Sequence, residues 1–353
     1  MQLEQLQTPA LILDMDLFEQ NMATMKNFLT PLGLALRPHY KSHKCTAIAH
    51  MQIAQGAKGI CCAKLGEAED LVNAGIEDVL IANQIIDQAK LARVAHLANC
   101  CYLTICVDNE ENIKALEAAA AVQNATIHCL IEYEIGMKRC GVETPEAFYA
   151  LAKEISDCPH LVFEGIQAYA GHLSHETDFE TRKVESEKVE QRLLELRTYL
   201  EQKSMPVKEV SGASTGTVEF RTKNSVYTEI QAGSYIFMDT AYNALNLSFK
   251  SALFLLCTVM STNPHLVIVD TGRKSVSLDQ MMPILENYPQ WPLKVSEEHS
   301  AVSAQECHAA IGDKLRMIPG HCCTAVNLHN HLYFVRGNKV IDKVPITSRG
   351  NSI

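Results

Sequence analysis

The sequence predicts an α/β protein in which a (β/α)8 barrel of the TIM type is followed by an all-β domain. From residue 10 to about 245, short apolar runs alternate with amphipathic segments, as parallel βα units do. Eight such units in about 235 residues fit a barrel better than an open sheet. After about Asn246, apolar runs follow one another with no helical segment between them.

The expected barrel strands are short apolar runs at residues 34–41, 59–63, 79–82, 103–107, 127–132, 163–169, 207–211 and 229–237. The expected helices are amphipathic and span residues 17–29, 46–55, 66–74, 110–122, 145–155 and 178–202. No Gly-x-Gly-x-x-Gly follows the first strand, which argues against a dinucleotide-binding sheet.

The second domain is predicted to contain only strands, at residues 253–260, 266–269, 315–318, 325–329, 331–335 and 339–341. Residues 329–331 and 336–338 have the composition of hairpin turns. We expect the N-terminal strand, residues 10–13, to join this sheet. The predicted domains are therefore residues 10–245 for the barrel, and residues 246–353 with 1–13 for the β domain.

The composition indicates a globular protein of the cytoplasm. The net charge of −10 argues against nucleic acid or an anionic membrane as partner. No apolar run approaches the roughly 20 residues of a membrane helix, and the N-terminus lacks the features of a signal peptide. The 13 cysteines are an odd number, so they cannot all pair within the chain. Five lie in apolar, strand-like runs and are predicted to be buried thiols: Cys61, Cys62, Cys106, Cys129 and Cys257.

The segment Arg37-Pro-His-Tyr-Lys-Ser-His-Lys44 places five actual or potential cations behind the apolar run at residues 34–36. Lys41 would stand at the mouth of a buried strand, where low dielectric and neighbouring cations lower the pKa of an amine and free it as a nucleophile. Lys41 is therefore a candidate Schiff-base lysine. A basic surface loop is the alternative interpretation of this segment taken alone.

In a parallel barrel the active site lies at the C-terminal ends of the strands. Two loops there, residues 211–217 and 232–235, are rich in glycine and hydroxyl side chains, and such loops can bind phosphate. Each loop alone is a weak signal, since most such segments are simple turns. Together with a lysine in the same barrel, they indicate a pyridoxal phosphate site held by Lys41.

Motifs along nearly the whole chain support this interpretation. They are Thr8-Pro-Ala10, Arg37-Pro-His-x-Lys41-x-His-Lys44, Gly66-Glu-Ala-Glu-Asp-Leu71, Gly136-x-x-Arg139-x-Gly141, Tyr169-x-Gly171, Gly233-Ser-Tyr-x-Phe-Met-Asp239 and Pro319-Gly-His-x-Cys323. In this order they resemble the D-threonine aldolase and D-serine dehydratase family, which are alanine-racemase-type (fold type III) pyridoxal phosphate enzymes. The resemblance implies a homodimer and a divalent metal beside the cofactor.

The resemblance also implies roles for individual residues. Arg139 would lie near the pyridine nitrogen, where a permanent positive charge disfavours protonation of that nitrogen. The other implied cofactor contacts are Tyr169 to the ring, Thr215, Gly233 and Ser234 to the phosphate, and Tyr242 on the far side of the site. A surface arginine and a strand-end aromatic residue are the structural alternatives for Arg139 and Tyr169.

His321 and Cys323 are candidate metal ligands. We expect them on an extended segment, where residues two apart point the same way while Cys322 faces away. Two ligands leave coordination positions open for water and substrate. The thiolate favours zinc, and manganese or cobalt could also occupy such a site. A structural cysteine pair is the alternative.

Two lyase reactions of a D-3-hydroxy amino acid are open. Removal of the hydroxyl proton leads to cleavage into glycine and an aldehyde, whereas removal of the Cα proton leads to dehydration, then a keto acid and ammonia. His175 resembles the hydroxyl base of the aldolases, with His172 as a competitor, but Cys323 resembles the ligand of the dehydratases. The wider motifs favour a D-threonine-type aldolase. The alternatives are a D-serine or D-3-hydroxyaspartate dehydratase, a racemase using Tyr288 or Tyr333, and a non-catalytic cofactor carrier.

Overall fold

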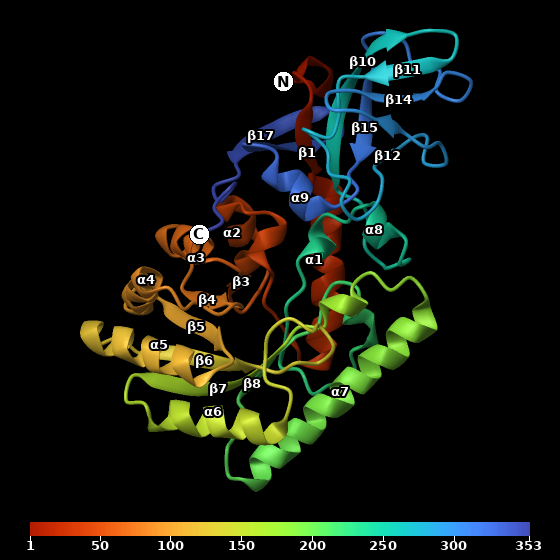
Figure 1. Cartoon of the computed structure of the whole chain (residues 1–353). Coiled ribbons are helices and arrows are strands. Elements are labelled where there is room, and N and C mark those ends of the chain that lie inside the picture. Colours follow the sequence, from red (N-terminus) through yellow and green to blue (C-terminus); the bar gives the residue numbers. More distant parts are fainter. The chain divides into compact units, whose positions relative to one another are not determined.

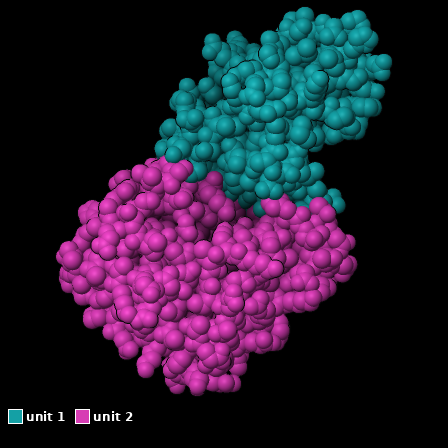
Figure 2. Space-filling view, viewed as in Figure 1, with its two compact units in different colours: residues 1–25, 42–47, 234–350 teal, residues 26–41, 48–233, 351–353 magenta.

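The computed structural model describes residues 1–353, and the chain divides into two compact units. Figure 2 colours unit 1, which is made of residues 1–25, 42–47 and 234–350, and unit 2, which is made of residues 26–41, 48–233 and 351–353. Each unit is built around its own sheet: a parallel sheet in unit 2 and a mostly antiparallel one in unit 1.

The sheet of unit 2 has eight strands, paired in the order β2-β9-β8-β7-β6-β5-β4-β3 with every pair parallel. A parallel bridge between His39 and Cys61 joins the segments of the two end strands, so the sheet closes into the predicted barrel. The strands are β2 (Ala35–Leu36), β3 (Ile60–Cys62), β4 (Asp78–Ile81), β5 (Tyr102–Val107), β6 (Ile127–Glu132), β7 (Leu161–Ala168), β8 (Glu209–Gly212) and β9 (Glu229–Ile230).

Helices connect these strands, and Figure 1 shows α3 to α6 along the outside of the sheet. Several begin with a side chain that accepts a hydrogen bond from a backbone N–H of the first turn, as Asn109 does for α5 and Thr144 for α6. The α-helices up to the end of the barrel are α1 (Met15–Leu29), α2 (Thr46–Ala54), α3 (Leu65–Asn73), α4 (Gln88–Ala98), α5 (Glu110–Gln123), α6 (Pro145–Asp157) and α7 (Phe179–Gln202). Short 3-10 helices are η1 (Leu3–Gln5), η2 (Thr30–Leu32), η3 (Tyr40–Ser42), η4 (Gly171–Leu173) and η5 (Val218–Phe220).

Three details of the predicted barrel were wrong. Helix α4 was missed, although Asp87 caps it and its face with Leu91 and Val94 is buried. The first barrel strand ends at Leu36 and not at residue 41, because Pro38 has no N–H to donate to a ladder. The last strand ends at Ile230, and residues predicted to continue it form η6 (Ser234–Ile236).

The sheet of unit 1 has nine strands, and the strand at the N-terminus joins it as expected. Strand β1 pairs antiparallel with β10 and parallel with β16, and its Ile12 lies in a core with Phe254 and Val335. The strands are β1 (Ala10–Asp14), β10 (Leu253–Thr262), β11 (Leu266–Val269), β12 (Ile284–Leu285), β13 (Lys294–Val295), β14 (Ser300–Ser303), β15 (Lys314–Ile318), β16 (His331–Arg336) and β17 (Lys339–Pro345). Unit 1 also contains α8 (Thr240–Asn243) and α9 (Cys322–Asn327).

The predicted C-terminal β domain is confirmed, but one segment of it that was assigned to a strand is helical. Residues 325–327 belong to α9 and not to a strand, because the N–H of Cys322 at the helix start is capped by the buried carboxylate of Asp239 at 2.7 Å. Residues 329–331 therefore leave a helix and do not form a hairpin. The hairpin turn at residues 336–338 is confirmed between β16 and β17. Strands β12, β13 and β14 were missed.

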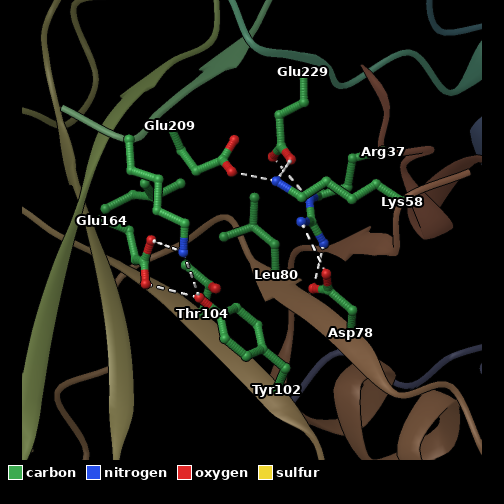
Figure 3. A pocket seen from close by; sticks show the side chains of 11 residues that line it. Arg37, Lys58, Asp78, Leu80, Tyr102, Thr104, Glu164, Glu209 and Glu229 are labelled. Carbon is green, nitrogen blue, oxygen red and sulfur yellow. Dashed lines mark hydrogen bonds and ion pairs between the residues drawn. The ribbon is translucent and has the colours of Figure 1, made fainter. Parts of the chain in front are cut away.

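Charged side chains fill the end of the barrel where strands begin, around a cavity of about 180 Å3 (Figure 3). The guanidinium of Arg37 lies 2.7 Å from Asp78 and 2.8 Å from Glu229. Lys58 lies 3.2 Å from the second oxygen of Glu229 and also pairs with Glu209. Arg37, the first cation of the segment 37–44, is thus a buried structural group. The N-terminal end of a barrel is where contacts that stabilise the fold are expected.

All 13 cysteines are free thiols. The five thiols predicted to be buried in strands are buried, which confirms that prediction. None of the helices combines the length and the apolar character that a bilayer span requires.

Candidate active site

A cavity of about 190 Å3 lies at the opposite end of the barrel, where the strands end. Lys41, Arg139 and Tyr169 line it together, which brings three of the predicted site residues into one place. They follow β2, β6 and β7, of which β6 and β7 are neighbours in the sheet and β2 lies apart from them. The remaining lining residues are His39, Ala63, Ala82, Asn83, Cys140, Gln167 and Gln231.

Lys41 lies in the short helix η3, and its ammonium nitrogen is 5.1 Å from the centroid of the Tyr169 ring. This distance is within the range of a cation–π contact. Gly171 makes room for the ring, because a Cβ at this position would lie 2.4 Å from Cε1 of Tyr169. The strand-end tyrosine is therefore held beside the amine and is not merely a core aromatic residue.

Arg139 lies at the rim of the cavity, and its side chain is about half exposed. One guanidinium nitrogen is 3.6 Å from Oε1 of Glu132, and the other oxygen of that carboxylate accepts a hydrogen bond of 2.6 Å from Gln84. The loop before Arg139 is shaped by Glu134, whose carboxylate accepts from the N–H of Gly136 at 2.6 Å. Gly136 has φ +128°, a conformation that side chains rarely adopt.

The predicted phosphate residues of unit 2 do not line this cavity. Thr215 is fully buried in a turn in which the N–H of Thr217 donates to the carbonyl of Ser214 at 3.2 Å. Residue 216 must be a glycine, because a Cβ at this position would lie 2.7 Å from the carbonyl oxygen of Ser174. Gly233 is buried and follows the last barrel strand.

The two histidines considered as bases follow β7, and neither lines the cavity. His172 belongs to η4, and its ring lies against Gly136, where an added Cβ would be 2.6 Å from the imidazole. Burial lowers the pKa of His172, although the charge of Glu134 opposes this. His175 lies half-buried in the turn after η4.

The other predicted cofactor residues, Ser234 and Tyr242, belong to unit 1 and are buried there. Asp239, which has no assigned role in the sequence motif, organises this region. One of its oxygens accepts from the N–H of Tyr242 at 2.9 Å, and the other accepts from the N–H of Cys322 at 2.7 Å. The carboxylate thus links the start of α8 to the start of α9.

His321 and Cys323 stand at the start of α9, with His321 as the N-cap residue, so the expected extended segment was wrong. Their side chains nevertheless meet and are hydrogen-bonded. The thiol of Cys323 also lies 3.6 Å from the hydroxyl of Ser42. Cys322 is completely buried.

A third residue contacts this pair. Oδ2 of Asp279 is 2.7 Å from Nδ1 of His321. Burial alone would lower the pKa of His321, but hydrogen bonds and negative charge from Cys323 and Asp279 outweigh it and raise the pKa to about 9. No group of three or more His, Cys, Asp or Glu side chains is arranged to hold a metal ion, so the structure offers two donors here, one nitrogen and one sulfur.

Sequence reasoning missed Asp279 and the glutamines of the cavity. Asp279 is 42 residues from His321, and no spacing connects them. Gln167 and Gln231 are buried and bonded to each other, with Nε2 of Gln231 donating to Oε1 of Gln167 at 2.6 Å. Their signal was available: each is a polar residue at the C-terminal end of a barrel strand, Gln167 within β7 and Gln231 directly after β9.

Comparisons with known proteins follow the same division of the chain. The family model for the alanine racemase N-terminal domain matches residues 13–241, and that for a putative serine dehydratase domain matches residues 252–335. A D-threonine aldolase of an Arthrobacter species is 38% identical over 99% of this chain and 94% of its own length. A 3-hydroxy-D-aspartate aldolase of Paracoccus denitrificans is 36% identical over 98% of this chain and 93% of its own. The crystal structure of D-threonine aldolase from Filomicrobium marinum superposes with a TM-score of 0.96 at 36% identity, covering 99% of this chain and 98% of that one.

Proposed function

This chain belongs to the D-threonine aldolase and D-serine dehydratase family of alanine-racemase-type enzymes, and we propose that it is a lyase that cleaves D-3-hydroxy amino acids of the D-threonine type. The products are glycine and an aldehyde, and the reaction requires pyridoxal phosphate and a divalent metal. The observation that carries the proposal is the cavity at the strand ends in which Lys41, Tyr169 and Arg139 meet. Both relatives compared above are aldolases, which favours this reaction.

The residues of the cavity fit pyridoxal phosphate. A primary amine lies beside an aromatic ring, and a permanently charged guanidinium stands at the rim. Lys41 would hold the cofactor, Tyr169 would contact its ring, and Arg139 would face the pyridine nitrogen. Thr215, Gly233 and Ser234 would bind the phosphate, and Tyr242 would stand on the far side. The bound cofactor supplies an electron sink for the bond that breaks at Cα.

His321 and Cys323 fit a catalytic metal, because an imidazole nitrogen and a thiolate are donors that zinc prefers and manganese accepts. Two protein ligands would leave coordination positions open for water and substrate. A metal there supplies a Lewis acid that acidifies the substrate hydroxyl.

A base of the chain must then take the hydroxyl proton. We assign this role to His175, because histidine is the side chain that most often acts as a base near neutral pH. His172 is the competing candidate, on the neighbouring helix η4. The positive charge of Arg139 would keep the pyridine nitrogen of the cofactor unprotonated. Tyr169 would fix the direction from which the amine of Lys41 approaches the cofactor.

One observation favours a second candidate function. Cys323 resembles the metal ligand of the dehydratase branch of the family, and residues 252–335 match a putative serine dehydratase domain. A dehydratase would remove the Cα proton and release a keto acid and ammonia from D-serine or D-3-hydroxyaspartate.

The proposal extends to the organisation of the protein. Residues 10–245 would carry the cofactor, and residues 246–353 with 1–13 would carry the metal ligands. A homodimer and a cytoplasmic location complete the proposal, the first by resemblance to the family and the second supported by 13 free thiols.

Product analysis tests the function. The purified protein with pyridoxal phosphate and Mn2+ or Zn2+ is given D-threonine and, separately, D-serine. Glycine and acetaldehyde from D-threonine are the expected products. Pyruvate and ammonia from D-serine, with no glycine from D-threonine, would establish the dehydratase instead. A protein that binds the cofactor and forms neither set of products would contradict both lyase functions.

A further inference from the structure

Asp279 holds the ring of His321 through a short contact. A carboxylate can only accept hydrogen bonds, so the 2.7 Å separation between Oδ2 and Nδ1 means that Nδ1 carries the hydrogen. Of the two ring nitrogens, Nε2 would then be the one that binds a metal. The contact thus gives the two ring nitrogens different roles: Nδ1 binds Asp279, and Nε2 would bind the metal.

The carboxylate is itself held in place. Its other oxygen, Oδ1, accepts a hydrogen bond of 2.6 Å from the hydroxyl of Thr324, which lies in α9 one residue after Cys323. Asp279 is therefore tied both to the ring of one proposed ligand and to the helix turn that carries the other. A carboxylate with a single contact could rotate, whereas one with both oxygens engaged cannot do so without breaking a bond.

The backbone of His321 is fixed to the same segment. Its N–H donates to the hydroxyl of Ser277 at 3.0 Å, and that hydroxyl donates to the carbonyl of His321 at 2.6 Å. Residues 277 and 279 are two apart, so one short segment holds both the main chain and the ring of His321. Contacts within the protein thereby fix the position and the rotation of the imidazole ring without a bound metal.

We infer that Asp279 is a positioning residue for the metal site, which fixes the ring orientation and the hydrogen position of His321. The inference rests on the proposed function, because it takes His321 and Cys323 as the metal ligands. Carboxylates that accept from the second nitrogen of a metal-binding histidine raise the basicity of the ligand and limit its rotation, and their loss typically weakens metal affinity by about 10- to 100-fold.

The test is a Mn2+ titration of the metal-stripped, cofactor-loaded protein, followed by the electron paramagnetic resonance signal of free Mn2+. Asp279→Ala should raise the dissociation constant by about 10- to 100-fold. Asp279→Asn should recover part of this loss, because the amide oxygen can still accept from Nδ1. Side-chain exposure of 45% at Asp279 allows both variants to fold.

Glu117→Gln is the matched control, because Oε1 of Glu117 contacts Nδ1 of His160 at the same 2.7 Å in the barrel, and neither residue is a proposed ligand. It should bind Mn2+ as the wild-type protein does. Wild-type affinity in Asp279→Ala would overturn the inference, and so would equal losses in the Ala and Asn variants.

His321→Ala and Cys323→Ala in the same titration separate this inference from the proposed function. If both bind Mn2+ like the wild type, the proposed metal site itself is wrong. If both lose Mn2+ while Asp279→Ala keeps it, the metal site stands and only the role of Asp279 is wrong.

Discussion

Arg37 donates a hydrogen bond from Nε to Oε1 of Glu229 at 2.8 Å inside the barrel, where both side chains are almost completely buried. The pair links β9 to the segment that leads from β2 to Lys41. Asp78 binds the same guanidinium at 2.7 Å, so the cation lies between two carboxylates. The chain therefore places a structural cation at one end of the barrel and its candidate nucleophile, four residues later, at the other.

Breaking this pair should destabilise the protein. Glu229→Gln leaves Arg37 buried with only one carboxylate, and removal of one partner from a buried ion pair costs about 3 kcal/mol or more. The midpoint of urea unfolding, followed by circular dichroism, should fall accordingly. The control is Glu110→Gln, which breaks an exposed pair with Lys114 and should leave the midpoint nearly unchanged. Equal midpoints for the two variants would show that the buried pair is not stabilising.

The same pair predicts a pH dependence. Burial raises the pKa of Glu229, but the charge and hydrogen bond of Arg37 outweigh it and hold the pKa below its ordinary value. The ionised form is thus favoured by folding, so its contribution is complete above the unfolded pKa of about 4.3 and is lost as the pH falls through the lowered folded value. The stability difference between wild type and Glu229→Gln should be constant above about pH 5 and shrink below it. Urea midpoints across this range measure it, and a difference that grows with acid would contradict the assignment.

Lys41→Ala should remove the covalent attachment of pyridoxal phosphate, because Lys41 is the amine that lines the cavity at the strand ends. The visible absorbance of the bound cofactor should disappear on dialysis. Lys64→Ala, which changes an exposed lysine at the start of α3, should retain it. Borohydride reduction and peptide mapping of the wild type provide the direct measurement, and a modified peptide other than the one with Lys41 would refute the assignment.

Substitution of the two histidines after β7 should separate their roles. A general base contributes about 10²- to 10⁴-fold, so His175→Gln should lower kcat for D-threonine cleavage by that factor with little change in cofactor absorbance. His172→Gln should have a much smaller effect, since its ring packs against Gly136. The opposite ranking of the two kcat values would transfer the role of base to His172.

Gly171→Ala should weaken cofactor binding indirectly, by displacing the ring of Tyr169. The new Cβ would lie 2.4 Å from the ring of Tyr169, so the ring must move relative to Lys41. Overpacking of this kind costs about 1–3 kcal/mol, which corresponds to a rise of roughly 5- to 150-fold in the dissociation constant of pyridoxal phosphate. Gly75→Ala strains a left-handed residue after α3 but meets no neighbour, so it should leave that constant unchanged. An unchanged constant in both variants would mean that Gly171 does not position Tyr169.

The alternation of apolar and amphipathic segments was enough to predict a barrel, because each βα unit repeats the same local pattern. Helix α4 was missed, although its apolar residues lie on one buried face, and residues 325–329 were assigned to a strand. Short apolar segments are compatible with helix or strand. The capping carboxylate of Asp239, more than 80 residues away, selects the helix.

The sequence by itself determined the two kinds of sheet and the grouping of Lys41, Arg139 and Tyr169, because parallel strands bring their C-terminal ends to one edge whatever their order. Only the tertiary structure decided which groups hold the chemistry in place. The contacts of Asp279 with His321 and of Arg37 with Glu229 join residues 42 and 192 positions apart. No local spacing specifies such pairs, since they depend on which segments pack together, and packing is a property of the whole fold.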